Sequence, residues 1–354
     1  MRIAHLTWSL GIGGIQTMLT EIANIQIQHG HEVGIFVVDT YVSEKIVEKF
    51  DPKVRIYYLG RTRGKKALLP FIRLNWYLWR YKPDIIHSHA GKLIRIVFSQ
   101  KPAVATIHGP NCNPKDYKKY KSVYAISKFV QQEWIDKWGI RPILVENGID
   151  CKLIKTRAIH DLSKEIHIVQ VSRIMFDPKG QDILVKSFGN LINRLQNDKI
   201  NHYKKCFLHF VGDGLDFEKL KILVKDYGIE EYVVFEGFKD PRWVHEHLCD
   251  YDLFVQPSRR EGFGLTVAEA CAAKVPVLVS DIDGPLEIID GGRLGMTFKC
   301  GDINDLADKL YQFVHKGFDD AMVDEAYRYT CEHFDIHRTT QKYMNEYKKM
   351  LADR

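Results

Sequence analysis

The most constraining feature of this sequence is the stretch from Tyr251 to Glu287, in which two short apolar runs enclose a polar loop and a helix-forming segment. The first run, Leu253 to Gln256, is stopped by a proline, and the second, Val275 to Val279, has the composition of a buried strand. Between them a glycine-containing loop leads into a helix predicted from about Leu265 to Ala273. Alternation of strands and helices is typical of a parallel α/β sheet.

The loop of this stretch carries Gly262 and Gly264 directly before the predicted helix. A glycine-rich turn leaves backbone N–H groups free, and the start of a helix adds the positive end of its dipole. We therefore expect an anion site here, with phosphate as its usual occupant.

Two carboxylates frame the loop: Glu261 precedes the helix, and Glu269 lies just over one turn inside it. Carboxylates repel phosphate but accept hydrogen bonds from sugar hydroxyl groups. Together with the anion site they fit a molecule with phosphate between two hydroxyl-rich rings, which is a nucleotide sugar. Without the glycines, the pair would be read as a solvated helix residue and a loop residue.

The block EGFGLTVAEA, with Glu261 and Glu269 separated by seven residues, resembles the signature of retaining glycosyltransferases of family 4. The flanking DLFVQPS and VPVLVSDIDGPLEII match the same pattern. The resemblance implies an α/β protein of the GT-B fold, with two facing Rossmann-like domains built on parallel sheets.

The resemblance also assigns the donor site. In the family an Arg and a Lys clamp the diphosphate, and VSRI with DPKGQDILV puts Arg173 and Lys179 in those places. Gly237 and Phe238 would support the base, Glu261 would bind the hexose and Glu269 the ribose. The implied donor-binding residues are Gly13, Gly14, Arg173, Lys179, Gly237, Phe238, Glu261, Gly262, Phe263, Gly264, Leu265 and Glu269.

Residues 1–155 are expected to form an acceptor-binding Rossmann-like domain, rejoined by a C-terminal helix at about 336–354. A glycine turn ends the first strand, but Gln16 stands where a dinucleotide fingerprint needs glycine, which disfavours NAD. The predicted strands are Arg2–Ser9, Val33–Asp39, Val54–Leu59, Asp84–Ser88, Ala103–His108, Ser122–Ile126 and Ile143–Glu146.

Three histidines end successive strands, at the edge where α/β sheets bind ligands. His108, in TIHG, is followed by a glycine and a proline, and the family places a His-Gly near the sugar ring. We expect His108 to act there, and His87 and His89 to be packing or acceptor-side groups.

Residues 156–335 are expected to form the donor-binding Rossmann-like domain, with strands Ile166–Ser172, Phe207–Val211 and Val233–Gly237 ahead of Leu253–Gln256. Asp281 and Asp283 have the spacing of a metal-binding DxD pair. They follow the strand after the donor helix, and the two cations already neutralise the diphosphate. We therefore expect neither a metal nor any other cofactor.

Seven cysteines are scattered without a CxxC pair or a Cys/His cluster, which favours a reducing compartment and argues against zinc. The N-terminus shows no secretion signal, and no run of 18 apolar residues occurs. We expect a cytoplasmic protein, in contact with the inner face of the membrane if it is peripheral.

Charge is uneven: residues 1–150 hold 22 Lys and Arg against 12 Asp and Glu, whereas the whole chain is only +6. The first half should therefore meet an anionic partner, which can be lipid phosphate, a membrane surface or nucleic acid. The stretch Ala67–Tyr81, after the basic RTRGKK, predicts a helix that covers the sheet, lies on anionic lipid, or does both. In the last case aromatics would face inward, with Arg73, Arg80 and Lys82 outward.

The resemblance implies retaining transfer of a hexosyl unit, from a donor that we expect to be UDP-linked, to a saccharide or lipid-linked saccharide in surface polysaccharide or lipopolysaccharide synthesis. Arg173, Lys179 and the helix start would stabilise the leaving group, with Glu261 and His108 at the sugar. Front-face attack by the acceptor hydroxyl is the preferred mechanism. Alternatives are a nucleotide-sugar epimerase of the same fold, a phosphorylase, which would need a much longer chain, and a non-enzymatic nucleic-acid-binding protein, which would leave the two Glu without purpose.

Overall fold

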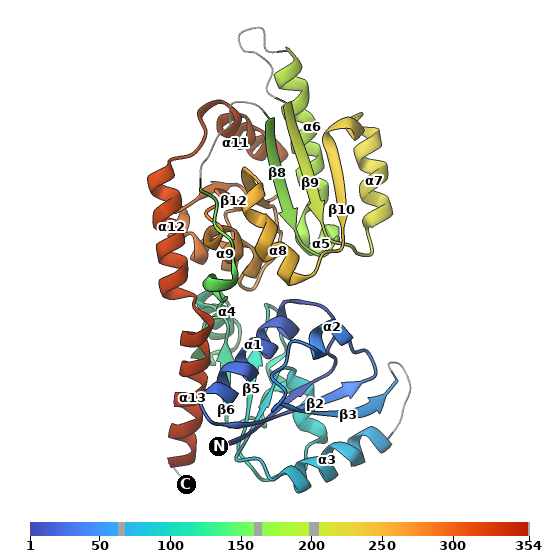
Figure 1. The fold of residues 1–354 in the computed structure, drawn as a ribbon, viewed down its shortest axis with the longest axis vertical. Coiled ribbons are helices and arrows are strands. Elements are labelled where there is room, and N and C mark those ends of the chain that lie inside the picture. Colours follow the sequence, from blue (N-terminus) through green and yellow to red (C-terminus); the bar gives the residue numbers. More distant parts are fainter. Residues whose placement is uncertain (63–67, 159–164, 198–204, 353–354) are drawn as a thin grey trace. The chain divides into compact units, whose positions relative to one another are not determined.

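The chain forms two compact units in a computed structural model (Figure 1). Unit 1 comprises residues 1–148 and 334–354, and unit 2 comprises residues 149–333. The structure describes residues 1–62, 68–158, 165–197 and 205–352. Most of the basic RTRGKK stretch and part of the expected domain connection lie outside the described residues.

Unit 1 is built on a seven-stranded parallel sheet with the strand order β3-β2-β1-β4-β5-β6-β7. The order doubles back at β1 and β4, as in a doubly wound sheet, and places their carboxyl ends next to each other. The strands are β1 (Arg2–Thr7), β2 (Glu32–Asp39), β3 (Arg55–Arg61), β4 (Ile85–Ser88), β5 (Ala103–Ile107), β6 (Ser122–Ala125) and β7 (Ile143–Leu144).

The last helix of the chain packs in unit 1. Its side chains Tyr343 and Tyr347 are fully buried, in one core cluster with Met18 and Ile22 of the first helix. The helices of unit 1 are α1 (Gly14–Gln28), α2 (Glu44–Val47), α3 (Leu69–Tyr81), α4 (Lys128–Trp138) and α13 (Ile336–Ala352). At the start of α4, Ser127 Oγ accepts from the N–H of Val130 at 3.0 Å, as its N-cap position predicts.

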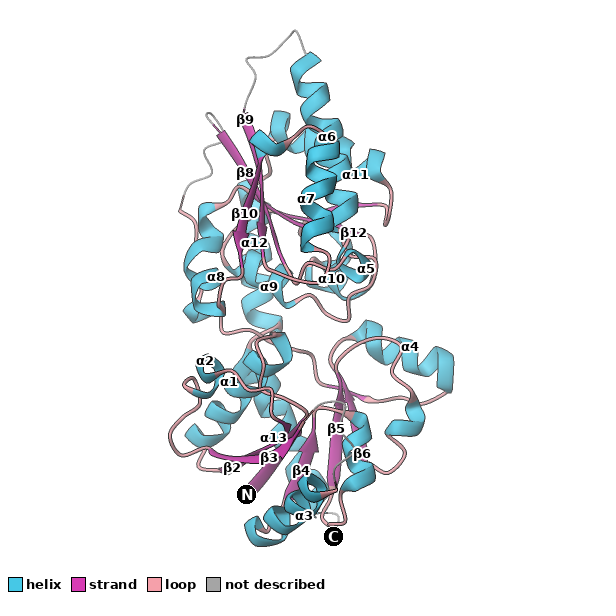
Figure 2. Cartoon of the chain, turned by 90° about the vertical axis from the view of Figure 1, so that its right-hand side faces the viewer, coloured by secondary structure: helices cyan, strands magenta, loops and turns pink. Residues whose placement is uncertain are grey.

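Unit 2 contains a six-stranded parallel sheet in the order β10-β9-β8-β11-β12-β13. Figure 2 shows this sheet with α6 and α7 on one side and α8 and α9 on the other. The strands are β8 (Glu165–Val171), β9 (Lys205–Val211), β10 (Val233–Gly237), β11 (Leu253–Gln256), β12 (Val277–Ser280) and β13 (Met296–Phe298). The helices are α5 (Phe176–Lys179), α6 (Gln181–Asn197), α7 (Phe217–Asp226), α8 (Pro241–His247), α9 (Leu265–Ala272), α10 (Asp283–Ile288), α11 (Ile303–Lys316) and α12 (Asp320–His333).

The predicted fold class is confirmed, because each unit is a parallel sheet flanked by helices. The predicted strands all overlap observed ones, and the predicted helix at residues 265–273 is α9. The strand expected at Val275–Val279 begins later, at Val277, because Lys274 takes a left-handed turn with φ 57° after α9.

The outer face of α3 differs from the prediction. Its inner face is formed by Leu74, Leu78 and Tyr81, which are buried. The expectation that its aromatics face inward is wrong for Trp76 and Trp79, which are 47% and 71% exposed. Both lie on the helix face opposite the sheet, at the helical spacing that also brings Ile72 outward. Among the described residues, no helix is both long enough and apolar enough to cross a membrane.

Candidate active site

Two loops meet at the centre of the unit 2 sheet because β8 and β11 are neighbouring parallel strands. The loop after β8 includes α5, and the loop after β11 runs from residue 257 to residue 264. The N–H of Arg259 donates to the carbonyl oxygen of Pro178 at 2.8 Å and so ties one loop to the other. This is the carboxyl edge of the sheet, where α/β folds bind their ligands.

Gly180 allows this close contact. Its φ is 72°, and a Cβ atom at this position would lie 1.9 Å from the carbonyl oxygen of Pro257. A side chain there would push the two loops apart. The loop after β11 ends at Gly264, whose φ of 99° lies in the left-handed region, and α9 begins at the next residue.

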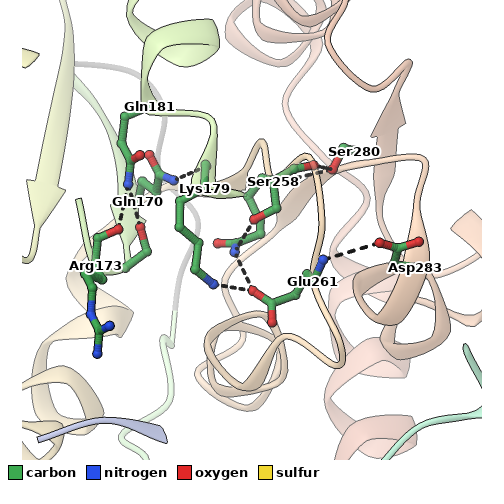
Figure 3. A network of polar contacts seen from close by, with 10 residues as sticks. Gln170, Arg173, Lys179, Gln181, Ser258, Glu261, Ser280 and Asp283 are labelled. Atoms are coloured by element: carbon green, nitrogen blue, oxygen red, sulfur yellow. Dashed lines mark hydrogen bonds and ion pairs between the residues drawn. The ribbon is translucent and has the colours of Figure 1, made fainter. Parts of the chain in front are cut away.

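Lys179 and Glu261 form an ion pair across the two loops (Figure 3). Gln170 donates to the carbonyl oxygen of Lys179 at 3.0 Å and holds the backbone of that residue. The side-chain amide of Gln256 reaches Ser258 Oγ at 2.9 Å and a Glu261 oxygen at 3.5 Å. Lys179 and Glu261 are therefore positioned by buried glutamines that the sequence analysis did not single out.

Arg173 lies at the end of β8 and is exposed. Its carbonyl oxygen accepts a 3.0 Å hydrogen bond from Gln181, but its guanidinium contacts no carboxylate of the described residues. Figure 3 shows the side chains of Arg173 and Lys179 extending in the same direction from this edge. The backbone here is packed tightly, because a Cβ at Gly212 would lie 1.9 Å from the carbonyl oxygen of Ser172.

The two arginines of the SRREG loop are already paired. Arg259 makes two hydrogen bonds to the carboxylate of Asp182, at 2.7 and 2.8 Å, and this carboxylate raises the pKa of the Arg259 guanidinium. Arg260 binds Asp177 through both carboxylate oxygens at 2.9 Å. These pairs fasten the loop to α5 and α6, and they leave Arg173 as the cation of this edge without an acidic partner among the described residues.

Glu269 lies on α9 in the first turns after Gly264. One of its carboxylate oxygens is 3.3 Å from Nε2 of His245, which belongs to α8. The sequence analysis missed His245, because the contact joins two separate helices and no motif links them. The first N–H groups of α9 have no acceptor within the helix, as at any helix start.

The carboxylates of the DxD-like pair, Asp281 and Asp283, both accept hydrogen bonds from backbone N–H groups. Asp281 accepts from the N–H of Cys300 at 2.8 Å, and Asp283 accepts from the N–H of Glu261 at 3.3 Å. These bonds give both residues a role in shaping the loops around Glu261.

Across the sheet, Gly237 has a φ of 69°, and its carbonyl oxygen accepts from the N–H of Gly212 at 2.9 Å. Phe238 beside it is 48% exposed.

The predicted residues of the first half lie in unit 1. Gly13 precedes α1 in an extended conformation with φ 172°, and Gly14 is the first residue of the helix. His108 follows β5, and its Nε2 atom is 3.1 Å from Nδ1 of His89. His87 and His89 are buried in the same cluster.

Comparison with known proteins identifies the family. The model for "Glycosyl transferases group 1" matches residues 154–329, and the model for "Glycosyltransferase Family 4" matches residues 12–153. The chain belongs to glycosyltransferase family 4. The predicted resemblance is thereby confirmed.

This family 4 chain is 29% identical over 341 residues to the lipopolysaccharide 1,6-galactosyltransferase of Escherichia coli (strain K12), with 89% of each chain covered. It is 28% identical over 221 residues to N-acetyl-alpha-D-glucosaminyl L-malate synthase of Bacillus anthracis, covering 59% of this chain and 54% of that protein. Matches to several relatives span about half of the relative's length. The crystal structure of Anabaena HepE in complex with UDP and glucose has the same fold, with a TM-score of 0.79 at 19% identity over 97% of this chain and 98% of that one.

Gly180→Ala tests whether the contact between the two loops depends on this glycine. The substitution should destabilise unit 2 by more than the about 1–2 kcal/mol that a left-handed backbone alone costs, because the new Cβ meets the Pro257 carbonyl. Urea unfolding measures the loss. The control is Gly139→Ala, which has a similar φ of 64° and no atom within 4 Å of its Cβ. Equal losses for both variants would contradict the packing argument.

Proposed function

We propose that this family 4 chain transfers a hexosyl unit from a nucleoside diphosphate sugar to a saccharide acceptor. The observation that carries the proposal is the cation arrangement at the carboxyl edge of the unit 2 sheet. Arg173 has no acidic partner among the described residues, while Lys179 is paired with Glu261 beside it. An anion at this edge gains a free guanidinium, a lysine and the start of α9.

A diphosphate suits this edge better than a single carboxylate. The guanidinium of Arg173 offers a planar fork for one phosphate, and the mobile ammonium of Lys179 can follow a second. When the sugar–phosphate bond breaks, negative charge grows on the leaving diphosphate, and these groups stabilise it in place. The cations thus perform the charge neutralisation that a metal performs elsewhere, and the proposed reaction needs no metal. The backbone bonds of Asp281 and Asp283 support this assignment.

The two glutamates are assigned to the sugar rings. Glu261, next to Lys179, would accept hydrogen bonds from the hexose, and Glu269, further along α9, from the ribose. The exposed Phe238 and the main chain of Gly237 would support the base. For His108 of unit 1, the proposed partner is a saccharide hydroxyl. We propose transfer with retention, in which the acceptor hydroxyl attacks on the face that the diphosphate leaves and gives its proton to that diphosphate.

The proposed donor is UDP-linked, and the proposed acceptor is a saccharide or lipid-linked saccharide of a surface polysaccharide or lipopolysaccharide. HepE in complex with UDP and glucose supports the donor, and the galactosyltransferase of lipopolysaccharide supports the acceptor class. An epimerase of the same fold would alter the sugar without any acceptor. Incubation with donor alone separates the two, because only an epimerase converts the donor to a second nucleotide sugar.

We also propose that α3 contacts an anionic membrane surface. Its outer face exposes Trp76, Trp79 and Ile72, and Arg80 lies over the Trp76 ring at 5.6 Å. Phe98, which is 80% exposed, is held beside this face by a 2.7 Å hydrogen bond from its N–H to Asn75. Tryptophans with flanking arginines are the composition of an interfacial helix.

Replacing Arg173 by Met tests the diphosphate clamp. The variant should bind UDP about tenfold to a hundredfold more weakly, because a hydrogen bond to a charged group contributes about 1.5–3 kcal/mol. Isothermal titration with UDP measures the change. The matched variant Arg242→Met removes an exposed arginine that pairs with Glu246, and it should leave UDP affinity unchanged. Wild-type affinity in Arg173→Met would remove the basis of the proposal.

Glu269→Ala addresses the ribose contact. It should lower kcat/KM by about two to three decades, or about 2–4 kcal/mol of transition-state binding. Initial rates with the UDP-sugar that binds best in a thermal-shift screen give the value. Glu218→Ala, at a side chain that is 79% exposed on α7, is the control. Unchanged kcat/KM in Glu269→Ala would exclude this residue from the donor site.

A Trp76→Ser, Trp79→Ser double variant examines the membrane contact. Its binding to vesicles of phosphatidylglycerol and phosphatidylcholine should fall about tenfold or more, because two aromatic side chains no longer leave water. Co-sedimentation at two salt concentrations provides the measurement. Trp138→Ser, which changes a 50% exposed tryptophan on α4, should bind as the wild type does. Equal binding by all three proteins would contradict the assignment of α3.

A further inference from the structure

Three buried side chains of unit 1, those of Gln26, His5 and His89, form a continuous hydrogen-bonded row with the half-buried His108; we call this row the histidine relay. Gln26 Oε1 lies 2.8 Å from His5 Nε2, and His5 Nδ1 lies 3.1 Å from His89 Nε2. His89 Nδ1 in turn lies 3.1 Å from His108 Nε2. At the far end, the Nδ1 atom of His108 is buried and has no hydrogen-bond partner among the described residues. The relay thus leads from α1 across β1 and β4 to the end of β5.

A fourth histidine lies in the same stack but belongs to a separate branch. The His87 ring is 4.5 Å from that of His89, yet its Nδ1 atom bonds the hydroxyl of Tyr347. Its Nε2 atom is 2.8 Å from Thr106 Oγ1, which is 2.9 Å from the Tyr343 hydroxyl. His87 therefore shares the burial of the relay without taking part in it.

The relay histidines are neutral at physiological pH. Burial lowers the pKa of His5 and the pKa of His108 to about 4, and it holds the pKa of His89 well below its ordinary value. A neutral imidazole has one N–H donor and one nitrogen acceptor. Each ring in the row must then donate in one direction and accept in the other, so the choice made at one end fixes every proton up to the other end.

Gln26 determines the direction of these hydrogen bonds. A carbonyl oxygen only accepts, so His5 carries its proton on Nε2, and its Nδ1 atom accepts from His89 Nε2–H. His89 Nδ1 then accepts from His108 Nε2–H, which leaves a bare lone pair on His108 Nδ1. We infer that Gln26, His5 and His89 are positioning residues, which hold His108 in the Nε2–H tautomer with Nδ1 as a hydrogen-bond acceptor for a saccharide hydroxyl.

The direction rests on the placement of the Gln26 amide, whose oxygen rather than its nitrogen lies against His5. Space is open beside the acceptor, because a Cβ at Gly109, directly after His108, would have no atom within 4 Å among the described residues. The ligand part of this inference rests on the proposed function, whereas the tautomer part does not.

The same imidazoles allow a competing arrangement. One nitrogen each of His5, His87 and His89 lies within 4.8 Å of the others, a spacing that a divalent cation can bridge. Both nitrogens of His87 and both of His5 already have partners within the cluster, however. A cation would have to displace them, so the relay accounts for the contacts better.

Long-range ¹H–¹⁵N spectra of the protein labelled with ¹⁵N-histidine, recorded without substrate, read the tautomer directly. His108, assigned by the loss of its signals in His108→Gln, should show a protonated Nε2 and a bare Nδ1 that lacks a hydrogen-bonded proton. A proton on Nδ1 would overturn the inference, because it means that the Gln26 amide and the whole row point the other way. Changes at His5 and His89 on adding stoichiometric Zn²⁺ would overturn it too, in favour of a metal site.

The matched variants are Gln26→Met, which conserves volume but removes the acceptor, and Thr106→Val, which alters only the His87 branch. Gln26→Met should give His108 a mixture of tautomers and lower kcat/KM about tenfold, with unchanged UDP affinity because UDP binds unit 2. Thr106→Val should keep the wild-type tautomer and the wild-type kcat/KM. Wild-type kcat/KM and tautomer in Gln26→Met would sink the inference. If UDP binding itself failed, the donor-site proposal would fall and the tautomer result would stand.

Discussion

The candidate site depends on the contact between the loops that follow β8 and β11. Because these strands are neighbours in a parallel sheet, both loops leave at the same edge, although about 80 residues separate them in the chain. Their backbones touch at Gly180 and Pro257, and the pairing of Lys179 with Glu261 follows from that approach. The sheet topology thus places Lys179 next to Glu261, and their ion pair depends on the contact between the two loop backbones.

Charge at this edge is divided between two kinds of arginine. Arg259 is paired with Asp182 and Arg260 with Asp177, and these ion pairs hold the loop after β11 in place. Arg173 has the same chemistry but no such partner among the described residues, so its charge remains for a ligand. A count of basic residues cannot make this distinction; the carboxylates within reach of each guanidinium decide it.

The sequence predicts most of the sheet strands and both members of the ion pair, because these depend on local patterns. An apolar run ended by a proline, or a glycine-containing loop before a helix, can be recognised within about a dozen residues of sequence. The contacts missed are those between elements: His245 reaches Glu269 from another helix, and His5 meets His89 only through the pairing of β1 with β4. The prediction that Trp76 and Trp79 face inward was wrong for a different reason, since aromatic residues alone do not indicate which face of an amphipathic helix packs on the sheet.

The position of α13 has a consequence for biosynthesis. Its buried tyrosines complete the core of unit 1 and bond the histidine cluster, yet the whole of unit 2 separates them from the rest of that unit in the chain. During translation, unit 2 has all of its residues available while unit 1 still lacks a helix. The apolar surface of α1 that α13 covers therefore stays exposed until residues 336–352 have been synthesised. In this protein the half whose synthesis begins first cannot complete its core until the other half has been made.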